Sequence, residues 1–284
     1  MAGGSVACTG SASPAPPASP APAGSAPAGW PPPPNAPIPT DPSVVASTLR
    51  RADAELRNAL PAWAGGPPSA RPPADAVLLS LYEQRVFGTI ATRPALVREV
   101  VAKLPARLAG AVRANVAANQ SLRSLSGPPP ATPPKLHTVD PRPAGELLAD
   151  YRAAERRFHV AWQVLAAVNF IESKFGRVTS KSSAGAQGPM QFIPSTWKAY
   201  GLGGNVRDPR DAIMGAANYL SASGAPADYP GAVYHYNPSH AYVRAVLLYA
   251  RRMMRDPLAY WSYYNWQVFV ASKAGDRRLT GPGL

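Results

Sequence analysis

The chain is poor in residues that cross-link a protein or anchor it in a bilayer. Cys8 is the one cysteine among 284 residues, so no disulfide can form within the chain. No apolar run approaches the roughly eighteen residues that a membrane-spanning helix needs. Acidic residues are also scarce, since 16 Asp and Glu stand against 29 Lys and Arg and leave a formal charge of +13.

The positive charge is spread along the sequence without a block of like charge. Such a spread argues against a dedicated nucleic-acid-binding stripe, and we expect no nucleic-acid partner. It suits a protein that works along an anionic polymer.

The N-terminal stretch, residues 1–42, carries thirteen prolines among many Ala and Ser residues. It cannot bury enough apolar area to offset the cost of ordering the chain, so we predict a disordered tether. Within it, Ser5-Val6-Ala7-Cys8 partly resembles a lipobox, although no basic segment and no long apolar segment precede it. A lipid anchor on Cys8 and an incidental cysteine both stay open.

Helical periodicity starts after Pro42. Apolar residues recur at spacings of three and four over residues 43–56, at Val45, Leu49, Ala52 and Leu56. We predict a break from Pro61 to Pro73, then helices over 74–88 and 94–125, the latter interrupted at Pro105. Residues 43–126 are therefore predicted to form a helical accessory region without chemistry of its own.

A proline-rich linker is predicted over residues 127–143. It contains His137, but no second His or Cys lies at a spacing typical of metal ligands. We interpret His137 as a surface residue, and we expect no metal.

A glutamate stands in an unusual position at the end of an apolar helix. Leu165, Val168 and Glu172 share one helical face, although a buried charge is costly unless it is paired or protonated. Gly176 stands where a left-handed cap would fall, which places Glu172 in the last turn. The helix dipole and partial burial favour the protonated form that a general acid needs. The alternatives are a solvated glutamate at a helix end or an ion pair with the nearby Lys174 or Arg177.

A loop of small residues, 182–188, follows this helix. Its glycines allow positive φ, and its lack of bulk lets a ligand lie close to the backbone. Gln191 then offers a donor and an acceptor that suit hydroxyl or acetamido groups. A plain turn is the alternative, but after an in-register glutamate we predict one wall of a groove.

Further downstream, Asp208 and Asp211 suggest a helix start, with Pro209 at the first turn. We interpret both carboxylates as helix-capping groups rather than as a second catalytic pair. Tyr234, His235 and Tyr236 precede an asparagine, and such aromatic and amide groups suit sugar rings. We interpret His235 as a packed or rim residue.

Two C-terminal elements are predicted after these aromatics. Residues 240–255 read as a helix. Residues 260–270 are aromatic and β-branched, which predicts a strand or an extended segment.

Three linked motifs resemble the lytic transglycosylases of bacterial cell-wall metabolism, specifically the membrane-bound B type in its short actinobacterial form. They are Glu172-Ser173-Lys174-Phe175-Gly176, the stretch from Ser182 to Trp197, and Tyr236-Asn237. The resemblance implies a mainly α protein with a lysozyme-like (goose-type or SLT) catalytic domain over residues 144–284.

The resemblance also implies roles for individual residues. Glu172 would be the single general acid and base. Five residues match glycan-binding positions of the family: Ser182 for the N-acetyl group, Gln191 for a sugar at the cleavage site, Tyr219 as a groove aromatic, and Tyr236 and Asn237 near the scissile bond. No cofactor is implied. The chain lacks the long insertion and the acidic calcium-type loop of the B-type enzymes of Gram-negative bacteria, so we expect no structural calcium.

Glu172 is the one candidate catalytic carboxylate. A single carboxylate points to a non-hydrolytic reaction, because hydrolytic glycosidases usually need two. The expected reaction cleaves the MurNAc-β-1,4-GlcNAc bond of peptidoglycan strands and leaves a 1,6-anhydromuramoyl end. A hydrolytic muramidase on the same scaffold and a non-catalytic wall-binding module stay open. We expect a monomer that is exported to the cell envelope, where a lipidated Cys8 would hold it at the outer face of the cytoplasmic membrane.

Overall fold

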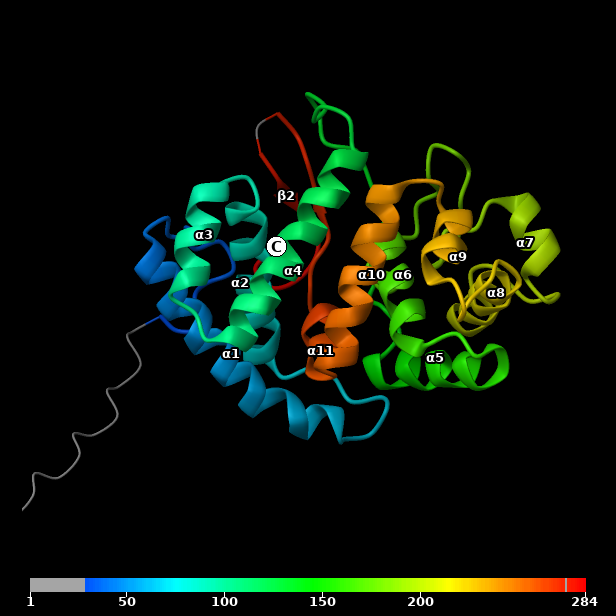
Figure 1. Ribbon diagram of the computed structural model, residues 1–284, viewed down its shortest axis with the longest axis horizontal. Helices are drawn as coiled ribbons and strands as arrows, with labels where there is room; N and C mark the ends of the chain where they lie inside the picture. The colour runs from blue at the N-terminus through cyan, green and yellow to red at the C-terminus, as the bar shows by residue number, and fades with distance from the viewer. Residues whose placement is uncertain (1–28, 274) are drawn as a thin grey trace, which may run out of the picture. The chain divides into compact units, whose positions relative to one another are not determined.

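The chain is mainly helical, as its periodicity predicts. The computed structural model describes residues 29–273 and 275–284, and Cys8 with most of the predicted tether lies outside them (Figure 1). Residues 31–284 form one compact unit. Its described elements are α1 (Pro42–Ala64), α2 (Ala74–Ile90), α3 (Pro94–Ala102), α4 (Ala106–Leu125), α5 (Ala144–Phe158), α6 (Trp162–Ser173), α7 (Pro194–Tyr200), α8 (Pro209–Ala222), α9 (Tyr229–Tyr236), α10 (His240–Arg255), α11 (Leu258–Tyr264), β1 (Phe269–Val270) and β2 (Arg277–Arg278).

Helix α1 begins where the sequence predicts and ends later. The Asp41 carboxylate accepts hydrogen bonds from the backbone N–H groups of Ser43 and Val44, both at 2.9 Å. The predicted break at Pro61 is wrong, because the helix continues through it to Ala64. Trp63 in this last turn is buried, with its ring 4.6 Å from that of Trp261, and this packing outweighs the hydrogen bond that a proline cannot make.

Helices α2, α3 and α4 follow the predicted boundaries closely, and the interruption at Pro105 is confirmed. Helix α4 packs along α10, far away in the sequence (Figure 1). The accessory helices therefore share a core with the C-terminal half of the chain. None of the helices in the described ranges is long and apolar enough to cross a membrane.

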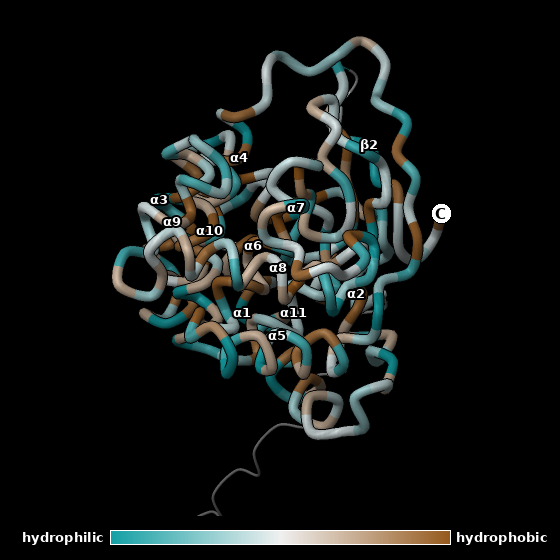
Figure 2. The backbone as a smooth tube through the Cα atoms, turned by 90° about the vertical axis from the view of Figure 1, so that its right-hand side faces the viewer, coloured by the Kyte–Doolittle hydropathy of each residue, from teal (hydrophilic) through white to brown (hydrophobic). Residues whose placement is uncertain are grey.

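The linker, residues 127–143, leaves the end of α4 and runs along the outside of the molecule to the start of α5 (Figure 2). A single backbone bridge between Thr138 and Val178 fastens it to the segment that follows α6. His137 is exposed in this linker. The His137 backbone N–H donates a hydrogen bond of 2.7 Å to the Ser180 hydroxyl, which holds the linker at this point.

Helix α6 is the central helix of the second half of the chain. It contacts α5, α8, α10 and α11. Every residue from Val164 to Phe170 is buried, as expected for a helix that is surrounded by other elements. In its C-terminal turn, Ile171 and Glu172 are half-buried and Ser173 is buried.

The predicted extended segment over residues 260–270 is wrong for its first half. Residues Leu258–Tyr264 form helix α11, and only Phe269–Val270 form a strand, paired antiparallel with Arg277–Arg278. Every residue from Ala259 to Tyr264 is buried, so aromatic rings surround this short helix. The strand propensity of these aromatics is overridden because a helix lets them pack in all directions into one aromatic core.

Part of the predicted tether, residues 29–42, belongs to the residues that the structure describes. Residues 31–41 lie beside the C-terminal segment, where Arg278 donates a hydrogen bond of 3.3 Å to the Asn35 side-chain oxygen. A turn closed by the Ala36 N–H and the Pro33 carbonyl at 3.0 Å leads into α1. This packing gives part of a proline-rich segment a fixed place that composition alone does not predict.

Candidate functional site

Helix α6 ends in a left-handed turn that fixes the position of Glu172. Three consecutive residues have positive φ: Lys174 at 53°, Phe175 at 61° and Gly176 at 87°. The helix therefore ends at Ser173, and its left-handed cap is Lys174, two residues before the predicted Gly176. Glu172 lies in the last turn, as predicted. Left-handed backbone at two non-glycine residues costs about 1–2 kcal/mol each. The buried Phe175 ring, 5.4 Å from that of Phe170, offsets part of that cost.

Ser173, the neighbour of Glu172, ties the helix end to the small-residue loop. Its hydroxyl donates a 2.5 Å hydrogen bond to the Pro189 carbonyl and accepts one of 2.9 Å from the Gly176 N–H. One turn earlier, the buried Asn169 amide donates to Met190 Sδ at 3.1 Å. Sequence reasoning missed both residues. The signal for Asn169 was a polar residue inside an otherwise apolar helix.

The small-residue loop is held together by hydrogen bonds between its own residues. The Ser182 hydroxyl accepts a hydrogen bond of 3.0 Å from the Ala186 N–H, and a bridge joins Gln187 to Phe192. Gly188 has a φ of 77°, and a Cβ placed there would lie 1.9 Å from the Val206 carbonyl oxygen. Only glycine therefore fits at this point of the loop.

Gln191 sits at the end of the loop in a left-handed conformation, with a φ of 49°. Its side-chain amide nitrogen donates to the Gly188 carbonyl at 3.0 Å. Its side-chain oxygen makes no hydrogen bond with any described residue, so this oxygen is the group that can accept from a ligand.

Two tyrosines connect the loop to helices α8 and α9. The Tyr236 hydroxyl donates a 2.7 Å hydrogen bond to the Met190 carbonyl, and its ring lies 5.6 Å from that of Tyr219. The Tyr219 hydroxyl donates to the His235 carbonyl at 2.8 Å. These bonds hold both rings in place. The side-chain amide of Asn237, at the end of α9, has no hydrogen-bond partner among the described residues.

The Glu172 carboxylate is paired with a tyrosine rather than a cation. The Tyr242 hydroxyl, on α10, donates a 2.5 Å hydrogen bond to Glu172 Oε1. Burial raises the pKa of Glu172 to about 7, against the opposing influence of this hydrogen bond and of the Lys174 charge. Tyr242 was not predicted, because nothing in its local sequence points to a residue seventy positions earlier.

The ion-pair alternative for Glu172 is not supported. No salt bridge joins it to a basic group in the described residues. The Lys174 ammonium donates instead to the Phe170 carbonyl at 3.2 Å and lies 4.1 Å from the centre of that phenyl ring. Burial lowers the pKa of Lys174 to about 8.

The structure brings the predicted residues together to different degrees. The Glu172 charge raises the pKa of Tyr236 further, after burial, which places these two groups within electrostatic reach. Gln191, Tyr219 and Tyr236 belong to one connected set of contacts around the loop. No hydrogen bond in the described part of the chain joins Ser182 or Asn237 to Glu172.

A comparison with protein families identifies this region. Residues 151–255 match the family model described as the Transglycosylase SLT domain. This part of the chain is a transglycosylase SLT domain. The match runs from α5 to the end of α10 and contains all six predicted site residues. No curated protein and no solved structure matches the chain.

Four carboxylates of the SLT domain, all within the described residues, cap backbone N–H groups. Glu155 accepts from Trp162 at 3.1 Å, Asp208 from Asp211 at 3.0 Å, Asp211 from Asn205 at 2.9 Å, and Asp228 from Gly231 at 3.0 Å. The capping role predicted for Asp208 is confirmed. Glu172 is the fifth carboxylate of the domain, and it caps nothing.

The side chains that could bind a metal ion do not form a cluster in the described ranges. No group of three or more His, Cys, Asp or Glu side chains there could hold a metal ion. In the loop before α8, the Asp211 carboxylate accepts a hydrogen bond of 2.9 Å from the Asn205 backbone N–H.

Proposed function

We propose that the protein is a lytic transglycosylase that cleaves the MurNAc-β-1,4-GlcNAc bond of peptidoglycan, with Glu172 as its single general acid and base. One observation carries this proposal. Glu172 is the carboxylate of the SLT domain that has no backbone-capping role, and its raised pKa keeps a large fraction protonated near neutral pH.

The reaction follows from a single carboxyl group. Protonated Glu172 donates its proton to the glycosidic oxygen, while the N-acetyl carbonyl oxygen of the muramic acid attacks its own anomeric carbon. The resulting Glu172 carboxylate is stabilised by the Tyr242 hydroxyl. It then takes the proton from the C6 hydroxyl, whose oxygen displaces the acetamido oxygen and closes the 1,6-anhydro ring. No water is consumed, and Glu172 ends protonated as it began.

The loop and α9 supply the binding groups in this proposal. The free Gln191 oxygen accepts from a sugar hydroxyl or acetamido N–H, and the Asn237 amide both donates and accepts. Ser182 orients the N-acetyl group. Tyr219 and Tyr236 offer ring faces to the apolar faces of the sugars.

A hydrolytic muramidase is less well supported, because it needs a second carboxylate to activate water. The other carboxylates of the domain are engaged by backbone N–H groups. Within the SLT enzymes, the residues of the three motifs favour the membrane-bound B type in its short actinobacterial form. A peptidoglycan substrate would require an exported protein of the cell envelope, and a lipid on Cys8 would tether it there.

Mass spectrometry of fragments released from purified peptidoglycan by the full chain tests the proposal. We expect fragments that end in anhydromuramic acid, one water lighter than reducing-end fragments. Glu172→Gln should release none while unfolding at the same temperature as the parent or higher. Glu155→Gln is the matched control, because its side-chain oxygen can still accept from Trp162, and it should stay active.

Three outcomes would contradict the proposal in different ways. Reducing-end fragments would identify a hydrolase. Binding to peptidoglycan without any release would identify a non-catalytic wall-binding module. Equal release by the Glu172→Gln protein, with contaminating activity excluded, would show that Glu172 is not the general acid and base.

A further inference from the structure

A basic pocket lies between α4 and α10, apart from the residues of the proposed active site. Its volume is about 490 Å³, which is within the range of small-molecule sites. Five arginines line it, drawn from three helices: Arg57 of α1, Arg107 of α4, and Arg251, Arg252 and Arg255 of α10. We call this set the arginine pocket.

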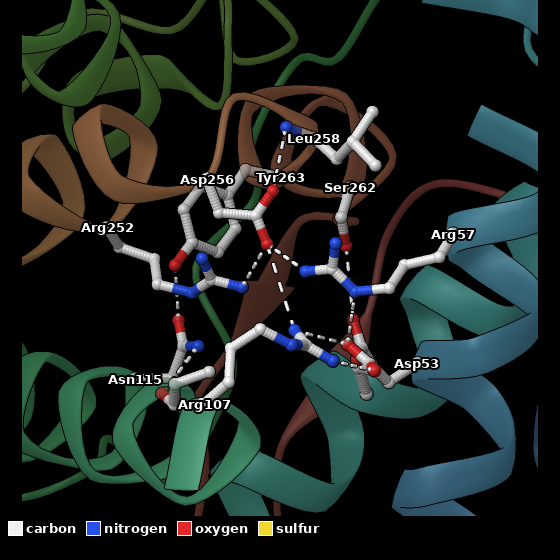
Figure 3. Close-up of polar contacts among 11 residues, drawn as sticks. Asp53, Arg57, Arg107, Asn115, Arg252, Asp256, Leu258, Ser262 and Tyr263 are labelled. Atoms are coloured by element: carbon white, nitrogen blue, oxygen red, sulfur yellow. Dashed lines mark hydrogen bonds and ion pairs between the residues drawn. The ribbon is translucent and has the colours of Figure 1, made fainter. Parts of the chain in front are cut away.

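Three of these arginines are held in place by two aspartates (Figure 3). Asp256 accepts hydrogen bonds from Arg57 and from Arg252, the latter at 3.0 Å. Asp53 engages Arg107 with both carboxylate oxygens, one of them at 3.0 Å from Nη1. Because these guanidinium groups are oriented before any ligand arrives, little conformational entropy is lost when an anion binds them.

The other two arginines carry charge that no carboxylate balances. Arg251 and Arg255 are exposed and form no ion pair within the described residues. Burial favours a raised pKa for Asp256, but Arg252 and Arg57 outweigh it and hold the pKa below its usual value. Five positive charges therefore face two negative ones, Asp53 and Asp256, and leave an excess of three.

The neighbouring cavity contains the buried Glu83, which can add at most one negative charge. The pocket stays positive in either protonation state of this group. Such an excess attracts anions and raises their local concentration.

The pocket also has room for an anion beside its cationic groups. Gly110, Ala111 and Ala114 of α4 line one side of it, so no long side chain fills the space. A Cβ placed on Gly110 would meet nothing within 4 Å. A ligand can therefore enter between the arginines.

Guanidinium groups recognise phosphate and carboxylate oxygens through paired N–H donors. A carboxylate is planar and is satisfied by one such fork. A phosphate presents oxygens in several directions, which suits arginines that approach from α1, α4 and α10. We propose that the arginine pocket binds a phosphate group, carried either by a free phosphate ester or by a phospholipid headgroup.

Isothermal titration of the full chain with inorganic phosphate and with glycerol 3-phosphate, at constant ionic strength in chloride, tests the proposal. The double variant Arg251→Gln/Arg255→Gln removes the two arginines that form no ion pair and leaves the aspartate pairs in place. It should weaken binding by at least about tenfold. The matched control is Arg152→Gln/Arg156→Gln, which changes two exposed arginines of α5 at the same spacing and should bind within about twofold of the parent.

Sedimentation with vesicles distinguishes the two sources of phosphate. Vesicles of phosphatidylcholine with phosphatidylglycerol are compared with phosphatidylcholine alone. Soluble-ester binding that depends on Arg251 and Arg255, without vesicle binding, assigns the pocket to a free phosphate ester. Dependence seen with the anionic vesicles alone assigns it to a headgroup. Binding to neither probe, or equal loss in the control variant, would overturn the proposal, and peptidoglycan cleavage by the double variant shows that the protein is folded.

Discussion

The Tyr242 hydroxyl on α10 donates a 2.5 Å hydrogen bond to Glu172 Oε1 on α6. This bond joins the carboxyl group of the proposed general acid to a helix that begins more than sixty residues later. It stabilises the ionised form, whereas burial stabilises the protonated form. The balance places the pKa of Glu172 near neutrality, where one group can both donate and accept a proton.

Tyr242→Phe should slow glycan cleavage by about tenfold or more, because a hydrogen bond to a charged group contributes roughly 1.5–3 kcal/mol. The variant should also move the pH midpoint for loss of activity upward, since the lost bond favoured the carboxylate. Tyr249→Phe is the matched control. Tyr249 is also buried on α10, but its hydroxyl makes no hydrogen bond with the described residues. Initial rates across pH measure both effects, and an unmoved midpoint would contradict this role of Tyr242.

Activity of the parent protein should fall as pH rises through about 7. The first proton transfer requires protonated Glu172, and burial raises its pKa to about 7. Above that pH the protonated fraction decreases about tenfold per unit. Release of soluble fragments, measured between pH 5 and pH 9 on one batch of peptidoglycan, checks this prediction. A rate that stays constant up to pH 9 would mean that Glu172 is not the acid.

Glu83→Gln should stabilise the protein at high pH. Burial, with the Asp53 charge, raises the pKa of Glu83 to about 7 in the folded state, from 4.5. The folded protein thus binds this proton more tightly than the unfolded chain, so stability is lost as pH rises from about 4.5 to about 7. Glutamine removes that loss.

The expected gain in the free energy of unfolding is up to about 3 kcal/mol at pH 8 and close to zero near pH 4.5. Urea unfolding at both pH values measures it. Glu99→Gln, at an exposed position of α3, is the control and should change stability by no more than about 0.5 kcal/mol at either pH. An equal change for Glu83→Gln at both pH values would show that burial does not control its protonation.

Gly188→Ala should disrupt the loop that holds Gln191. The new Cβ would lie 1.9 Å from the Val206 carbonyl oxygen, so the backbone has to move. Displacing a binding group by about 1 Å can lower activity about a hundredfold. Gly185→Ala is the matched control, because Gly185 has a φ of 79° but open space around it, and it should lose less than about tenfold. Comparable cleavage by the two variants would mean that the loop does not position the substrate.

The sequence alone predicts the parts of this protein that depend on neighbouring residues. The apolar spacing before Glu172 predicts a helix that ends just after it, and Asp208 predicts the start of α8. Both features arise from contacts within about four positions, where hydrogen bonding and side-chain direction follow directly from the order of residues. The order of the three motifs indicates the SLT domain, which the family match supports over residues 151–255.

The tertiary structure decides what distant segments do to one another. It makes residues 258–264 a helix, because their rings pack into a shared aromatic core, and it carries α1 past Pro61 through the packing of Trp63. It brings Tyr242 to Glu172, and it assembles the arginine pocket from three helices. Such contacts depend on how whole helices pack, because each pairing is set by the shape and burial of many side chains rather than by a local pattern.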